Sequence, residues 1–263
     1  MTWRLSAKCL AFARISAALT RAERGELLGR ALFFPLILGV FSALWRAVAE
    51  AGMPIAMRPS TLVWYVAATE WVLLSTPQIQ FQIERDVRNG DIAYRLPRPV
   101  SYLTAALAEG FGSLAMRAPI MAVAALLSAV AFAGLPEHPR GLLFLAPLGF
   151  CASAILMVFN VCMGILAFWF QAIAPIHWVW QKLSFVLGGL MLPLELFPEA
   201  IQWCARATPF PTVLYGPARF MMGSGVEHAA GLTLALALWL CVALGLAVLL
   251  YGRVLRSIAI NGG

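Results

Sequence analysis

Charge is what this sequence has least of. Only 12% of its 263 residues are Asp, Glu, Lys or Arg, about half the share in an ordinary globular protein, whereas 62% are hydrophobic. A water-soluble fold of this length could not bury so much apolar surface, so the composition predicts a polytopic membrane protein. The basic residues form no patch with interleaved aromatic residues, which argues against nucleic-acid binding.

Cysteine and histidine are too few and too scattered for a disulfide framework or a metal site. The five cysteines form no CxxC pair. Cys151, Cys162 and Cys241 lie in apolar runs, where a thiol usually serves as a small hydrophobic group. The three histidines have no second ligand near them in sequence. We therefore expect neither disulfides nor a bound metal.

Signatures of nucleotide hydrolysis and of common hydrolases are also missing. The sequence has no GxxxxGK[S/T] phosphate loop, no HExxH zinc motif and no GxSxG nucleophile motif. The chain is therefore expected to be non-catalytic and to obtain any energy that it uses from another protein.

Apolar segments alternate with short polar stretches along the chain, which predicts an all-α polytopic fold with six transmembrane helices. Their expected ranges are 31–49, 61–77, 118–135, 142–170, 183–193 and 229–251. Residues 1–30 carry six basic residues against two acids and a loose apolar stripe. They predict a helix lying in the membrane interface, with a frayed basic tail as the alternative.

Two connections and one long proline-interrupted segment complete this frame. Residues 50–60 predict a tight exterior turn, and residues 171–182 an aromatic turn at the membrane interface. Residues 194–225 are apolar but broken by prolines, so we expect an external hairpin that re-enters the membrane between spans five and six. The residues that mark this hairpin are Pro193, Glu195, Pro198, Glu199 and Pro209.

The densest run of charge lies between the second and third spans, in residues 84–99, and must face water or a protein partner. Ile79, Ile83 and Val87 recur at helical spacing just before Gly90, which predicts a short amphipathic helix that ends at a left-handed glycine. Prolines 97 and 99 then exclude helix, which predicts a stiff connector to the next helix.

A short rigid helix with charges of both signs suits the docking of a soluble partner, because charge pairs give steering and register. A solvated loop with local ion pairs is the alternative. The candidate docking residues are Glu84, Arg85, Asp86, Arg88, Gly90, Asp91, Arg95 and Arg98.

Two polar residues lie within the expected spans. Glu70 falls near the middle of the second span and Asn160 within the fourth. Both are candidates for lining a translocation path, because polar groups are costly there unless they face protein or water. A structural carboxyl for Glu70 and a contact between helices for Asn160 are the alternatives.

Basic residues also predict the orientation. The N-terminal stretch, the 84–117 region, Lys182 and the C-terminal stretch hold 14 Lys or Arg, and the opposite side holds five. The positive-inside rule therefore predicts that both termini and the charged loop are cytoplasmic. The net charge of +7 suits loops that face anionic membrane lipid.

Two groups of short motifs resemble one known family. Gly90 followed by Leu96-Pro97-Arg98-Pro99-Val100-Ser101 resembles the cytoplasmic loop motif of type-two, exporter-type ABC transporter permeases. The pairs and triplets of the fifth-span and hairpin region that resemble the same family are Gly188-Gly189, Pro193-Leu194, Phe197-Pro198-Glu199, Pro209-Phe210 and Pro217-Ala218. The resemblance extends over residues 25–256, and Pro97 departs from it where an aliphatic residue is usual.

The resemblance implies one permease domain over residues 1–263 of a bacterial inner-membrane exporter. Its expected parts are an interfacial connecting helix (1–30), spans one and two (31–77), a cytoplasmic coupling region (78–117) with a coupling helix at 84–91, spans three to five (118–193), the hairpin (194–225) and span six with a cytoplasmic tail (226–263). It also implies a separate ATP-binding subunit that binds ATP and Mg²⁺, and a second permease chain, identical or different.

Two other classes of function remain open from the residues alone. One is an integral membrane enzyme acting on lipid, with Glu70, His177 or Glu195 as its acid or base. The other is a membrane scaffold that anchors a soluble complex through the charged loop. The transported substrate is not predicted by the sequence.

Overall fold

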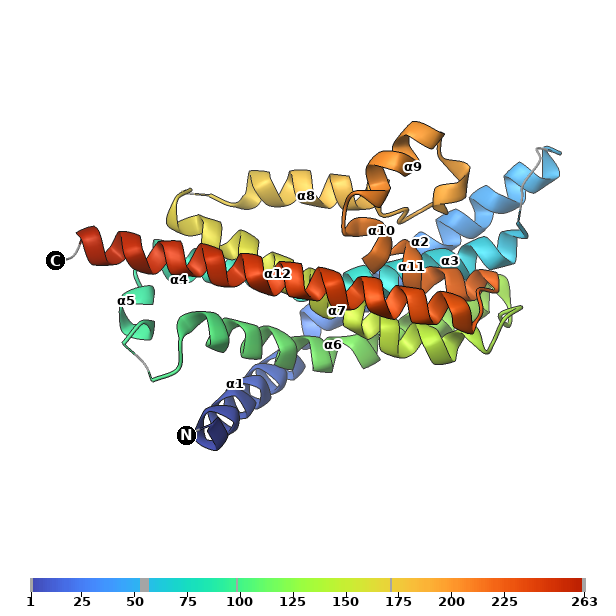
Figure 1. Ribbon diagram of the computed structural model, residues 1–263. Coiled ribbons are helices and arrows are strands. Elements are labelled where there is room, and N and C mark those ends of the chain that lie inside the picture. Colours follow the sequence, from blue (N-terminus) through green and yellow to red (C-terminus); the bar gives the residue numbers. More distant parts are fainter. Residues whose placement is uncertain (1, 53–56, 98, 171, 262–263) are drawn as a thin grey trace.

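The computed structural model describes residues 2–52, 57–97, 99–170 and 172–261, and these residues form helices and connections without a strand (Figure 1). The elements in chain order are α1 (Thr2–Ala22), α2 (Arg24–Glu50), α3 (Pro59–Ser75), α4 (Ile79–Arg88), α5 (Ile92–Arg95), α6 (Tyr102–Ala133), α7 (Gly141–Ile165), η1 (Leu166–Phe168), α8 (Ala174–Leu187), η2 (Leu194–Leu196), α9 (Glu199–Arg206), α10 (Phe210–Val213), α11 (Tyr215–Ala218), η3 (Arg219–Met222) and α12 (Val226–Asn261).

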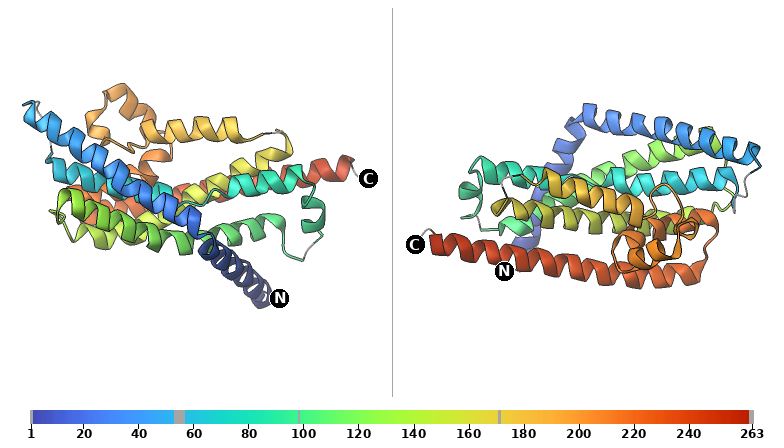
Figure 2. Two further views of the ribbon diagram at one scale, coloured as in Figure 1. Left: turned by 180° about the vertical axis from the view of Figure 1, so that it is seen from behind. Right: turned by 90° about the horizontal axis from the view of Figure 1, so that it is seen from above.

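The long elements form an elongated bundle. Its elements run in alternate directions along the bundle, in the order α2, α3 with α4, α6, α7, α8 and α12 (Figures 1 and 2). The start of α1, the tip helix α5 and the last turns of α12 lie toward one end, which we call the α5 end. The turn at 134–140 and helix α9 lie toward the other, the α9 end. The charged loop and both chain termini thus lie toward the same end, and the cytoplasmic location of that end stays a prediction.

Four helical segments of the described chain are long and apolar enough to cross a membrane. They are α2, α6, α7 with η1, and α12. The other two expected spans correspond to shorter helices, α3 with 17 residues and α8 with 14. The all-α membrane fold is confirmed, while the count of six spans stays a prediction.

Helix α3 occupies the centre of the bundle, and nearly all of its residues are buried. It ends at Ser75 because Pro77 has no amide hydrogen and forces Thr76 into an extended conformation. Carbonyl groups near this interruption then lack helical donors, and three side chains from two other helices, α2 and α7, donate to them. These bonds run from Ser153 Oγ to the Val72 carbonyl (3.0 Å), from Arg30 Nη1 to the Leu74 carbonyl (3.3 Å) and from Asn160 Nδ2 to the Pro77 carbonyl (3.1 Å).

Helix α1 packs tightly across α6. A Cβ atom built on Gly112 would lie 2.0 Å from the carbonyl oxygen of Ala13, so only glycine permits this approach. One residue further, Thr20 Oγ1 donates a buried hydrogen bond to Ser113 Oγ (2.9 Å). The helix breaks at Glu23, which corrects the expected interfacial helix over 1–30, because residues 24–30 already belong to α2.

Helix α8 differs from the prediction. Residues 174–182 already belong to it, so the expected aromatic turn at 171–182 is wrong, and the helix expected at 183–193 instead begins at Ala174 and ends at Leu187. Residue 171 lies outside the described part. Pro175 suits the first helical turn, where no amide donor is needed. Trp180 packs on Phe159 and Phe210, with ring centroids 5.1 and 4.7 Å away. Gly188 caps the helix, and the next residue adopts a positive φ.

The stretch after α8 is broken into short helices, as its prolines predict. Pro193 and Pro198 are extended residues directly before η2 and α9, so Glu195 lies in η2 and Glu199 begins α9, and Pro209 precedes α10. Phe210, Val213, Leu214 and Phe220 are buried in the bundle. Entry of this stretch into the membrane from the outer side stays a prediction.

Two side chains of α3 hold the turn that leads into this broken stretch. Tyr65 donates its hydroxyl hydrogen bond to the Gly189 carbonyl, and Thr69 Oγ1 donates to the Leu190 carbonyl at 2.6 Å. Helix α12 runs on to Asn261, so Arg253 and Arg256 lie on a helix and not in a tail. Of the expected turn at 50–60, residues 53–56 lie outside the described residues.

A matched pair of glycine substitutions tests the contact between α1 and α6. Gly112→Ala should lower the stability of the protein by about 1–3 kcal/mol, because the added methyl group collides with α1. Gly29→Ala, in α2 with open space around it, should leave stability unchanged or raise it by up to about 1 kcal/mol. Thermal unfolding in detergent measures both, and trypsin cleavage within α1 reports its release. Equal effects of the two substitutions would contradict the packing.

Candidate functional site

Helix α4 continues the line of α3 beyond the break and carries the charged loop. Its apolar face buries Ile79 and Ile83 against α7. A Cβ atom on Gly164 of α7 would meet Ile83 at 2.8 Å, so α4 lies close to that helix. The helix ends at Arg88, and Gly90 follows with φ +78°, which confirms the predicted glycine stop. Ser101 accepts a hydrogen bond from the Thr104 amide and caps α6.

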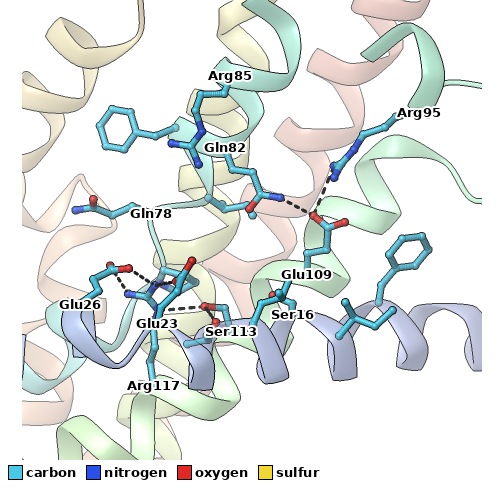
Figure 3. Close-up of a pocket in the computed structure, with 17 residues that line it drawn as sticks. Ser16, Glu23, Glu26, Gln78, Gln82, Arg85, Arg95, Glu109, Ser113 and Arg117 are labelled. Atoms are coloured by element: carbon cyan, nitrogen blue, oxygen red, sulfur yellow. Dashed lines mark hydrogen bonds and ion pairs between the residues drawn. The ribbon is translucent and has the colours of Figure 1, made fainter. Parts of the chain in front are cut away.

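A group of five side chains, which we call the α5 clamp, ties α5 to α4 and α6. Arg95 Nη1 lies 2.9 Å from Asp86 Oδ2 and 3.6 Å from Glu109 Oε2. Tyr102 donates from its hydroxyl to Asp86 Oδ2 at 2.8 Å. Gln82 Nε2 donates to Glu109 Oε2 at 2.9 Å (Figure 3). Such linked, charge-assisted bonds fix the tip relative to both neighbouring helices.

The predicted docking residues divide into two sets. Glu84 and Asp86 turn toward the protein: Glu84 is 8% exposed with its Oε1 3.7 Å from Arg88 Nη1, and Asp86 belongs to the clamp. Arg95 also belongs to the clamp. The predicted residues with exposed side or main chains are Arg85, Arg88, Gly90 and Asp91. Arg98 lies outside the described residues.

The structure adds Tyr94 to the exposed set. Its side chain is 79% exposed on α5, between Asp91 and Arg95 in the sequence. The range 84–91, expected to be one coupling helix, holds the end of α4 and the turn through Gly90, and the separate helix α5 follows it. The sequence already contained a signal for this exposed residue, because Tyr94 is a large aromatic residue soon after the helix stop at Gly90. The partners Gln82, Tyr102 and Glu109 carried no such signal, because their contacts depend on how α4 and α6 meet.

A second charged group, the Glu26 cluster, joins the start of α2 to α6. Arg117 is buried and binds Glu26 through two nitrogens, at 2.9 and 3.2 Å. Arg30 also binds Glu26, at 3.0 Å, and Arg117 Nε donates to Ser113 Oγ at 3.0 Å. Glu23, at the break between α1 and α2, stands 4.0 Å from Arg117. The cluster fixes the point at which α1 turns away from the bundle.

A cavity of about 530 Å³ lies between α1, α4 and α6, with the clamp on one side and the Glu26 cluster on the other (Figure 3). Phe12, Ile15 and Leu19 of α1 give it one apolar wall. Its size falls within the range of small-molecule sites.

Neither candidate for the translocation path joins this region. Glu70 is buried in α3, and within the described part of the chain no hydrogen bond or ion pair reaches its carboxylate. Asn160 donates its amide hydrogen to the Pro77 carbonyl, which is a contact between helices. A role of either residue in a path stays a prediction. Among the described residues, no three His, Cys, Asp or Glu side chains gather as a metal site would require.

Comparison with protein families decides the class of the protein. A family model described as "ABC-2 family transporter protein" matches residues 62–262. The chain belongs to this family. Membership confirms the resemblance to type-two ABC permeases and makes the chain a membrane transport component. The match begins inside α3 and includes α4, α5 and all later elements, whereas α1 and α2 precede it. Curated protein sequences give no match.

Substitution of Arg95 tests whether the α5 clamp holds α5 in place. Arg95→Gln should free α5 from α4 and α6, because it removes the cation that both carboxylates share. Hydrogen exchange of the amides at 90–96 should then become about tenfold faster or more, as the loss of charged hydrogen bonds worth about 1.5–3 kcal/mol implies. Arg88→Gln is the control, since Arg88 is exposed and only distantly paired. Unchanged exchange in Arg95→Gln would show that α5 is held by other contacts.

Proposed function

We propose that this chain is the permease subunit of an ATP-driven ABC exporter, and that α5 with the end of α4 receives the movement of a separate ATP-binding subunit. The observation that carries the proposal is an exposed tip that is tied rigidly to the membrane helices of an ABC-2 family chain. In this arrangement the partner binds ATP and Mg²⁺, and the permease contributes the path.

The connections of α5 suit the transmission of force. Asp86 of α4 and Glu109 of α6 share Arg95, so a push on α5 acts on both helices at once. Helix α4 leads to α3 through the residues around Pro77, which form a natural joint because no helical hydrogen bond crosses Pro77. A movement at the tip would therefore reach the centre of the bundle as a change of angle at this joint.

The remaining parts of the proposal follow from orientation and family. With the positive-inside rule, the α5 end faces the cytoplasm of a bacterial inner membrane, where ATP is available. A second permease chain, the same or different, would complete the path, and transport would run outward. Action as a lipid enzyme or a mere scaffold has less support, since the family is one of transport components.

A pair of exposed aromatic residues tests the docking. Tyr94→Ala should lower co-purification of the ATP-binding subunit at least tenfold, because exposed aromatic residues often contribute more than 1.4 kcal/mol to an interface. Trp203→Ala is the matched control: Trp203 is 76% exposed on α9, against 79% for Tyr94, but lies toward the opposite end. Both variants are expressed beside the ATPase and purified through a tag on the permease. Loss with Trp203→Ala and not with Tyr94→Ala would overturn the proposed docking surface.

Cysteine labelling tests the orientation. Cys204 is exposed on α9, and a variant in which it is the sole cysteine should react with a membrane-impermeant maleimide in intact cells. The same background with Cys204→Ala and Tyr94→Cys should react only after the cells are opened. The four other cysteines to be replaced are Cys9, Cys151, Cys162 and Cys241. The reverse pattern would show that the α5 end faces outward.

A further inference from the structure

We propose that the cavity between α1, α4 and α6 binds a phospholipid with a zwitterionic, primary-amine headgroup. Its phosphate would lie against Arg85, its ammonium against Glu23, and an acyl chain along the apolar side of α1. The proposal concerns this chain in its membrane and does not depend on an ATP-binding partner.

The charged side chains that line the cavity are balanced in number. Three arginines and three glutamates line it. Arg117 is neutralised by Glu26, and Arg95 by Glu109 and Asp86. One cation and one anion are thus left over. A ligand with only a negative charge would bind the unpaired cation but would be repelled by the unpaired carboxylate.

Those two remaining groups are free to bind a ligand. Arg85 is exposed on α4, and among the described residues no carboxylate or hydrogen-bond acceptor pairs with its guanidinium. Glu23 has a side chain 60% exposed, and its one cationic neighbour in the described structure is Arg117 at 4.0 Å, already bound twice to Glu26. They sit on different walls, Arg85 on α4 and Glu23 at the end of α1 (Figure 3).

Helix α1 gives the cavity an apolar wall. Ile15 and Leu19 are largely exposed on the side of α1 that lines the cavity, and Phe12 lies one turn before them. Basic residues flank this stripe on α1, at Arg14 and Arg21. An apolar stripe beside basic residues is typical of a helix at the membrane surface, where acyl chains and headgroups meet. The cavity therefore offers apolar cover and both charges.

Chemistry distinguishes the headgroup among common phospholipids. Guanidinium binds phosphate through paired N–H donors, which any phospholipid satisfies. A carboxylate accepts hydrogen bonds from a primary ammonium, whereas a quaternary ammonium has no N–H to donate and a glycerol headgroup has no cation. The primary-amine zwitterion, as in phosphatidylethanolamine, is the class that uses both groups.

Native mass spectrometry of the purified full-length chain tests the proposal with three lipids of identical acyl chains: phosphatidylethanolamine, phosphatidylcholine and phosphatidylglycerol. Wild type should retain phosphatidylethanolamine with the highest affinity. Arg85→Gln should weaken it about tenfold, and Glu23→Gln should weaken it by a similar factor, as expected for charged hydrogen bonds. Phosphatidylglycerol binding should fall with Arg85→Gln but not with Glu23→Gln.

Three further variants locate the site. Arg88→Gln and Glu50→Gln remove exposed charges of the same kinds outside the cavity and should leave all three affinities unchanged. Ser16→Trp should block the cavity, because Ser16 lines it. Circular dichroism and size exclusion verify that each variant is folded. Equal affinity for the three lipids, a preference for phosphatidylglycerol, or phosphatidylethanolamine binding that ignores Arg85 and Glu23 would overturn the proposal.

Discussion

The interruption of the second hydrophobic segment at Pro77 is the constraint on which much of this structure depends. A proline within a membrane removes a backbone donor and leaves carbonyl groups that lipid cannot satisfy. Here side chains of neighbouring helices replace the missing backbone donors: Ser153 and Asn160 from α7 and Arg30 from α2. The break is therefore also a point of assembly, because α2 and α7 must be in place before the end of α3 is satisfied.

The same interruption allows one segment to do two different tasks. Helix α3 is apolar and buried on nearly every side, whereas α4 is strongly amphipathic and ends in charge. Joined without a break, they would be one stiff rod fixed by the packing of its inner half. With the break at Pro77, α4 keeps its own contacts with α7, while α3 is held to the turn at 189–190 through Tyr65 and Thr69.

Local signals in the sequence predicted the amphipathic helix before Gly90, its glycine stop and the broken stretch after residue 193, because each depends on nearby residues alone. The start of α8 was missed, since tryptophans common at membrane interfaces also suit a packed helix, and Trp180 proves to contact Phe159 and Phe210. The clamp and the Glu26 cluster could not be predicted. Their partners come from separate helices, and no spacing in one helix specifies a contact with another.

Glu84 shows why charge alone was an incomplete guide to the proposed docking surface. An amphipathic helix must bury one face, and on α4 that face includes Gln80 and Glu84 as well as the isoleucines. The charges that hold the tip in place are thus largely inaccessible to a partner, and the charges that remain exposed precede an exposed aromatic residue on α5. This division has a mechanical consequence. A partner that pressed on a flexible loop would only deform it, whereas in the proposed function pressure on a tip fixed by Asp86, Arg95 and Glu109 would move the helices behind it.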